Sequence, residues 1–169
     1  MSQRLPVFIN PEHACARRLM ANGVLMLENM QRLRDRLLEP YGEVSVDLSF
    51  SQEGRNKRLD GTIKGKMVVE CQRCMEPMQI DVDHQFKLAF ISSDAEVDSL
   101  LPDEEPCLIG GEDLVLSDII EDELELLLPM IVMHENEQCN KEKYTNSEDA
   151  RDTEDEKDNP FSILADLKD

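Results

Sequence analysis

Cys71 and Cys74, spaced as C-x2-C, are the residues whose type and spacing most clearly indicate chemistry. Two thiolates at this spacing can bind one zinc ion from a tight turn, because zinc takes thiolate and imidazole ligands in a tetrahedral arrangement. A second pair of suitable ligands, His134-x4-Cys139, follows after 59 intervening residues. The sequence therefore predicts a zinc site formed by Cys71, Cys74, His134 and Cys139.

Two other interpretations of these residues stay open. In the first, Cys71 is a buried strand residue, Cys74 a turn residue and His134 a surface histidine, and no metal is bound. In the second, the cysteine pair is a thiol oxidoreductase motif, but such motifs follow a strand at a helix N-terminus, and no βαβ pattern surrounds this pair. No histidine has a serine or aspartate partner at a recognisable motif spacing, and no phosphate-binding glycine motif occurs. The sequence therefore indicates a protein that is not an enzyme.

The C-x2-C pair lies between the two most regular alternating segments of the chain, residues 59–71 and 78–91. Apolar side chains at every second position place one face of each segment against a core, as in half-buried β-strands. Residues 44–50 alternate in the same way. We therefore predict three antiparallel strands joined as a meander, with residues 72–77 as the turn of the second hairpin.

Helices are expected to flank this sheet. Asn10 followed by Pro11 is typical of a helix start and predicts a helix over 11–21, closed by Asn22-Gly23. A second helix is expected over 28–38, and a third, capped by Ser117, carries a wide apolar stripe as far as Leu128 that would cover the sheet. Residues 107–109 are expected to form an edge strand. The predicted fold class is α+β, an antiparallel meander-type sheet flanked by helices.

Five arginines on the two N-terminal helices make the densest basic zone of the sequence. They are Arg17, Arg18, Arg32, Arg34 and Arg36. Because the guanidinium group suits phosphate recognition, this zone is the candidate nucleic-acid or phosphate contact. An ordinary solvated helix face is the alternative interpretation.

Charge is distributed unevenly along the chain, which carries 18 basic and 37 acidic residues and a net charge of −19. Residues 1–75 hold 12 basic and 9 acidic residues, and residues 76–169 hold 6 and 28. This balance disfavours contact with bare phosphate and favours basic protein partners. The N-terminus has no hydrophobic run typical of a signal peptide, and no apolar run approaches the roughly 20 residues of a membrane span. We therefore expect a cytoplasmic protein with no membrane association and with reduced cysteines.

The composition changes after Cys139 and predicts three parts. Residues 1–139 form the α+β domain, and residues 140–158 form a disordered acidic linker, since they offer almost nothing to bury. Residues 159–169 end in a short hydrophobic motif with Phe161, Leu164 and Leu167 at helical spacing. This motif is expected either to dock on a partner or to fold back on its own domain.

Three stretches together resemble one bacterial family. They are residues 70–77 (Glu-Cys-Gln-Arg-Cys-Met-Glu-Pro), the acidic helix that runs into Leu128-Pro129 and on to His134 and Cys139, and residues 159–168 (Asn-Pro-Phe-Ser-Ile-Leu-Ala-Asp-Leu-Lys). Their order and spacing are similar to the YceD family, the large ribosomal RNA subunit accumulation proteins. The resemblance implies a non-enzymatic cytoplasmic protein needed for synthesis, processing or stability of 23S ribosomal RNA. It supplies no catalytic residues, and some relatives have a second cysteine pair where this chain has His134 and Cys139.

Two functions follow from these predictions. The favoured one is a ribosome-biogenesis factor that supports 23S rRNA or its precursor, directly or indirectly, through a basic ribosomal protein or assembly factor. In this interpretation the acidic C-terminal part holds the basic protein while the arginine zone contacts RNA. The alternative is a zinc-stabilised protein–protein adaptor without RNA contact.

Overall fold

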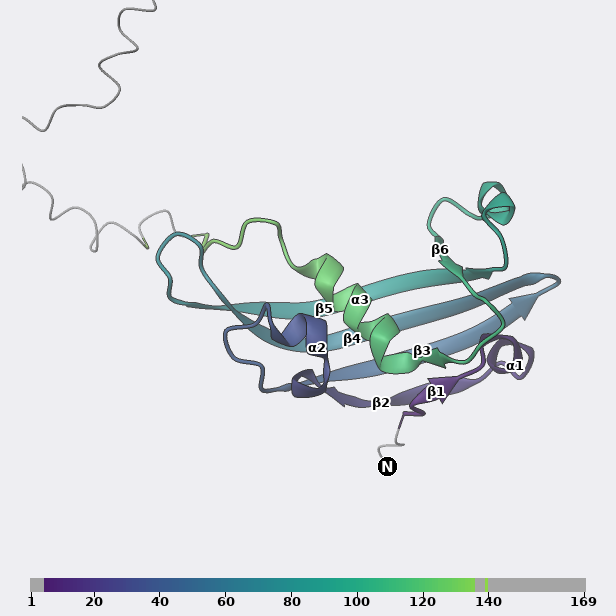
Figure 1. Cartoon of the computed structure of the whole chain (residues 1–169), viewed down its shortest axis with the longest axis horizontal. Coiled ribbons are helices and arrows are strands. Elements are labelled where there is room, and N and C mark those ends of the chain that lie inside the picture. The colour runs from purple at the N-terminus through teal and green to yellow at the C-terminus, as the bar shows by residue number, and fades with distance from the viewer. Residues whose placement is uncertain (1–4, 136–138, 140–169) are drawn as a thin grey trace, which may run out of the picture. The chain divides into compact units, whose positions relative to one another are not determined.

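A five-stranded sheet organises the fold in the computed structural model, which describes residues 5–135 and residue 139. The strands lie in the order β2-β3-β4-β5-β6 (Figure 1). Four of them form an antiparallel meander, and β6 joins β5 in parallel. Their bounds are β2 (Met20–Met26), β3 (Glu43–Glu53), β4 (Asn56–Glu70), β5 (Pro77–Ile91) and β6 (Glu105–Leu108). The predicted α+β class and the meander are confirmed.

One face of this sheet is apolar because side chains alternate along each strand. Along β3 the side chains at positions 44, 46, 48 and 50 are buried, and those at 43, 45 and 47 are exposed. Pairing aligns Val46 with Ile63, and Gly61 with Phe86. The absence of a side chain at Gly61 leaves space for the Phe86 ring, since a Cβ at position 61 would lie 2.1 Å from that ring. The period of two in the sequence thus determined which face of the sheet became the core face.

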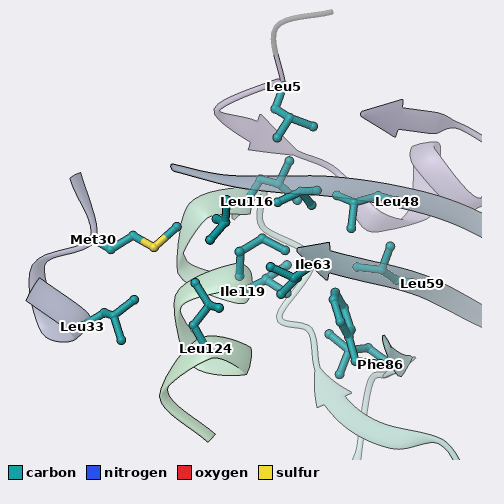
Figure 2. Packing of buried hydrophobic residues seen from close by; sticks show 14 of the residues in the cluster. Leu5, Met30, Leu33, Leu48, Leu59, Ile63, Phe86, Leu116, Ile119 and Leu124 are labelled. Carbon is teal, nitrogen blue, oxygen red and sulfur yellow. The ribbon is translucent and has the colours of Figure 1, made fainter. Parts of the chain in front are cut away.

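The helix α3 (Leu116–Leu127) covers the apolar face (Figures 1 and 2). Leu116, Ile120 and Leu124, each four residues apart, are at most 1% exposed and belong to one cluster with the sheet side chains. Full burial of such a side chain stabilises the fold by about 1.5–3 kcal/mol. The sequence predicted this covering helix. It begins one residue before Ser117, however, and has no side-chain cap.

A separate two-stranded antiparallel sheet leads into α3. It consists of β1 (Phe8–Ile9) and β7 (Leu114–Val115). The Leu116 N–H also donates to the Val7 carbonyl at 3.0 Å, so the chain enters the helix from a fixed direction. Between β5 and β6 the chain forms the 3-10 helix η2 (Asp94–Ser99), and β6 occupies the place of the expected edge strand.

The first helix is shorter than predicted. α1 (Pro11–Ala16) begins as expected, with the Asn10 side chain accepting the His13 N–H at 3.0 Å. It ends at Ala16 because Arg18 adopts a φ of 48°, and the Leu19 N–H donates back to the Ala14 carbonyl at 3.0 Å. This is the bonding of a left-handed helix end, formed here without glycine. The Asn22-Gly23 pair therefore lies inside β2, and the helix predicted over 11–21 was wrong in length.

The second predicted helix is replaced by two short turns, η1 (Leu27–Asn29) and α2 (Gln31–Arg34). Its predicted apolar stripe is nevertheless buried, with Met30 and Leu33 at most 1% exposed and Leu37 also buried. The Glu121 carboxylate of α3 accepts the backbone N–H groups of Arg32 at 2.6 Å and of Leu33 at 2.9 Å. A buried acid from a distant helix thus caps α2, which has no side-chain cap of its own.

Candidate metal centre

The loop between β4 and β5 presents the C-x2-C pair. Glu70 pairs with Pro77, so six residues, 71–76, close the hairpin. Within the loop the Met75 N–H donates to the Cys71 carbonyl at 2.8 Å, and the Cys71 N–H donates to the Glu76 carbonyl at 3.0 Å. Both cysteines are buried, at 0% and 2% exposure. The loop therefore turns two thiols inward at one end of the sheet.

The segment after α3 returns to this loop. The helix ends at Leu127, and Leu128 is extended (φ −70°, ψ 122°), as expected of a residue that precedes proline. Further along, the Val132 carbonyl accepts the Gln72 N–H at 2.8 Å, which is a direct contact with the cysteine loop. Two residues later comes His134. The proline that ends α3 and this hydrogen bond bring the chain just before His134 to the loop.

The four residues predicted as zinc ligands lie close enough to hold a metal ion. The ligand atoms of Cys71, Cys74, His134 and Cys139 all lie within 4.8 Å of one another. A tetrahedral zinc with Zn–S bonds of about 2.3 Å would separate its sulfur ligands by about 3.8 Å, so these positions fit one ion after small adjustments. Three thiols and an imidazole match the donor preference of zinc. Four protein ligands would close such a site, as in structural rather than catalytic zinc centres.

The predicted arginine zone is divided into two groups. Arg17 and Arg18 follow α1, while the other three belong to α2 and the turn after it. The strand β2 separates the groups by about 20 Å at roughly 3.3 Å per residue, and Figure 1 shows α1 and α2 at opposite ends of the sheet. All five arginines are exposed, but Arg32 forms ion pairs with Asp122 and Glu121 of α3. The five arginines therefore do not form one continuous surface, and their contact with nucleic acid or phosphate stays a prediction.

A buried acid pair on α3 was missed from the sequence. Besides Glu121, Glu123 has a side chain only 5% exposed, with its carboxylate 3.0 Å from the His84 Nε2 atom on β5. Burial raises the pKa of Glu123, and the hydrogen bond with His84 opposes that shift. Position 123 lies three residues after Ile120, within the apolar stripe of the helix. An acidic residue inside an otherwise apolar stripe was the sequence signal that could have predicted this buried carboxylate.

The remaining predicted residues, Phe161, Leu164 and Leu167, lie outside the described residues. Within the described part of the chain, no helix combines the length and apolar character that a bilayer crossing requires.

Taken together, the fold and the cysteine–histidine cluster define a small α+β domain with a candidate structural metal centre. The family model described as Large ribosomal RNA subunit accumulation protein YceD matches residues 59–168. A Large ribosomal RNA subunit accumulation protein YceD of Haemophilus influenzae is 29% identical over 169 residues, which cover 98% of this chain and 97% of the relative. The chain belongs to the YceD family. No solved structure matches it.

Proposed function

We propose that this protein is a cytoplasmic ribosome-biogenesis factor that supports the accumulation of 23S ribosomal RNA. The observation that carries the proposal is family membership: the family and its Haemophilus influenzae member are named for accumulation of the large ribosomal RNA subunit. The region compared with that relative covers 98% of the chain and therefore spans the positions of the four potential ligands.

We further propose that the protein acts without catalysis, through a basic ribosomal protein or assembly factor. The net charge of −19 supports this route, because a protein so acidic attracts basic proteins and repels RNA phosphates over most of its surface. The four potential metal ligands are all provided by the chain, which supports a structural centre rather than a reactive one.

Zinc is the metal that the donor set favours for this centre. Cys71, Cys74 and Cys139 would bind as thiolates and His134 as a neutral imidazole. When bound, zinc would hold the β4–β5 loop against the segment that follows α3. Its role would be to stabilise the domain.

Complementation of a strain without the gene tests the proposed function. The expected result is that deletion lowers the amount of mature 23S rRNA relative to 16S rRNA, and that the full chain restores it. Restoration by a Cys71→Ser, Cys74→Ser double variant would show that the centre is dispensable. An unchanged 23S rRNA level in the deletion strain would contradict the proposal itself.

The alternative is a zinc-stabilised adaptor that never contacts RNA, and the division of the arginines into two groups favours it. Exchange of Arg17, Arg18, Arg34 and Arg36 for glutamate separates the two functions. Arg32 is left intact because it forms ion pairs with two acidic residues of α3. Loss of 23S rRNA with an unchanged melting temperature would support phosphate contact, whereas full complementation would support the adaptor.

We propose that the terminal motif with Phe161, Leu164 and Leu167 contributes to partner docking. A pull-down compares the full chain with a version that ends at Cys139, and scores both RNA and basic proteins. Co-purification of 23S precursor and a basic ribosomal protein that is lost on truncation is the expected result. Equal capture by the shorter chain would move docking to the α+β domain.

A further inference from the structure

The face of the sheet opposite α3 is hollowed, and the segment before β6 contacts one end of it through the Arg58–Glu104 and Lys87–Asp103 ion pairs. The hollow has a volume of about 530 Å³ and extends across β2, β3, β4 and β5 to the segment before β6. Strand pairing aligns four polar outward side chains in one row across it. They are Asn22, Asp47, Thr62 and Gln85. A neighbouring row contains Asp60 and Lys87 as a cross-strand pair.

The charge of this hollow is negative. Its lining contains four carboxylates, from Asp47, Asp60, Asp103 and Glu105, and a single ammonium group, from Lys87. The Lys87 ammonium is already hydrogen-bonded to Asp103 at 2.6 Å. That bond raises the pKa of Lys87, and the charge of Asp60 raises it further. Among the described residues, Asp47 and Asp60 take part in no ion pair, so their charges stay available to an incoming cation.

Aliphatic side chains border the hollow along the edge strand β2. Met20, Val24 and Met26 point to the same face as Asn22, because the residues between them pair with the buried positions of β3. Met20 is 76% exposed, and the other two are also exposed. The long aliphatic stems of lysine and arginine cover such surface while their charged ends reach nearby carboxylates. The exposed aliphatic side chains therefore complement the stems of lysine and arginine, and the nearby carboxylates complement their charged ends.

We propose that this open sheet face, defined by Met20, Asp47, Asp60 and the hollow between them, binds an extended lysine- or arginine-rich segment of a basic protein. The inference rests on the proposed function and deepens it, since it places the basic partner on a particular surface of the domain. Four strands at about 4.8 Å spacing extend about 14 Å across, the length of four or five extended residues. An RNA strand is disfavoured here, because its phosphates would meet three carboxylates in excess of ammonium groups.

Direct binding by the full-length protein tests the proposal. The probe is a fluorescein-labelled 12-residue peptide of alternating lysine and glycine, followed by fluorescence anisotropy at physiological salt. The test variant is Asp47→Lys, Asp60→Lys. The matched control is Asp94→Lys, Asp98→Lys, which changes the net charge equally on the exposed η2 segment. We expect at least tenfold weaker binding for the test variant and less than a twofold change for the control.

Equal weakening in the two variants would overturn the proposal, because it would show attraction by total charge alone. An Asp47→Asn, Asp60→Asn variant with an unchanged melting temperature covers the case in which charge reversal unfolds the protein, and unchanged peptide affinity would overturn the proposal too. Tighter binding of a labelled poly(U) strand, lost in the same variant, would assign the face to RNA and overturn it.

Carbodiimide cross-linking locates the peptide independently. Lysine amines of the probe are expected to couple to Asp47 and Asp60, as identified by mass spectrometry. Coupling confined to Asp94, Asp98 or acids of residues 140–169 would contradict the assignment.

A cellular assay separates this inference from the proposed function. If the wild-type gene restores 23S rRNA and the Asp47→Lys, Asp60→Lys variant does so equally, the inference fails while the proposed function stands. If the wild-type gene has no effect on 23S rRNA, the proposed function fails, and peptide binding still decides the inference.

Discussion

The two loops that join β4 to its neighbours close similar antiparallel hairpins by different means. At the start of β4, Gly54 and Arg55 alone connect the paired residues Glu53 and Asn56. Gly54 has a φ of 62°, and a Cβ added there would meet no atom within 4 Å. The short exposed loop follows from backbone geometry with a glycine in the left-handed region.

The loop at the far end of β4 is longer than closure of a hairpin requires. Its six residues, 71–76, bury two thiols, and its left-handed position is filled by Met75, with a φ of 60°. The comparison shows that the additional residues of the longer loop allow it to bury cysteine side chains, which a two-residue turn does not do. The first loop is determined by its backbone, whereas the second buries two cysteine side chains.

Removal of one thiol from the long loop is expected to have the largest effect on stability. If zinc is bound at 1,000 times its dissociation constant, it stabilises the fold by about 4 kcal/mol. We therefore expect Cys74→Ser to abolish stoichiometric zinc and to lower the free energy of unfolding by about that amount. Elemental analysis of protein purified without chelator, together with urea unfolding, measures both.

Cys107→Ser is the matched control, because Cys107 lies on β6 and is not among the four clustered ligands. It should retain the metal. Absence of zinc from the wild-type protein would contradict a metal-binding role for the longer loop.

Exchange of Glu121 for glutamine should have the next largest effect, since it weakens the support of α2 beside the end of β4. The carboxylate accepts two backbone N–H groups, at 2.6 and 2.9 Å, and a buried group that loses its partner costs about 1–3 kcal/mol. We expect a loss of about 1–2 kcal/mol in denaturant unfolding. Asp122→Asn, at the exposed end of the Arg32 ion pair, should change stability by less than about 1 kcal/mol. Equal losses in the two variants would refute a capping role for Glu121.

Substitutions at the two left-handed positions sharpen the comparison of the loops. A left-handed φ costs a residue with a Cβ roughly 1–2 kcal/mol, partly offset by the lower entropy of its unfolded state. We expect Gly54→Ala to destabilise by about 0.5–1 kcal/mol and Met75→Gly to be close to neutral, as Met75 is 58% exposed and loses little burial. Thermal unfolding measures both, and a large loss for Met75→Gly would show that the methionine side chain itself supports the long loop.

The smallest expected effect is a pH dependence from Glu123. Burial raises its pKa above the ordinary value of 4.5, so the native state binds this proton more tightly than the unfolded state. Its contribution to stability is therefore complete below pH 4.5 and is lost as the pH rises through the raised pKa. Relative to Glu123→Gln, the wild-type melting temperature should improve as the pH is lowered from 8 to 5.

Three ionisable groups act on that carboxylate: His84 on β5, Glu105 on β6 and Asp122 on α3. The same pH series in a His84→Gln background removes the imidazole from this contact. A difference between wild type and Glu123→Gln that does not vary with pH in that background would contradict the assignment.

The sheet and its covering helix could be predicted because their signals are periodic over many residues. β4 and β5, at 15 residues each, leave little doubt about which face is apolar. The ends of the N-terminal helices could not be predicted in this way. Arg18 closes α1 in a conformation usually given to glycine, and the capping acid of α2 is 88 residues away from Leu33 in the chain. A local left-handed residue decided the first of these ends, and a tertiary contact decided the second.

The candidate metal centre was predictable for a different reason. Its ligand types are rare and their spacing is local within each pair, so two short motifs were sufficient. The arginine zone combined residues from two predicted helices, and β2 separates them. The open sheet face gave no motif at all, because strand register rather than sequence distance brings Asp47 and Thr62 side by side.

The position of α3 in the chain has a consequence for folding. The meander is complete at Ile91, but the helix that shields its apolar face starts only at Leu116, after 24 intervening residues. During synthesis, therefore, four strands with an uncovered hydrophobic face emerge before their cover. Exposed apolar sheet of this kind is prone to aggregate. The newly made chain depends on prompt arrival of residues 116–127, and fragments that end before Leu116 should be insoluble when expressed.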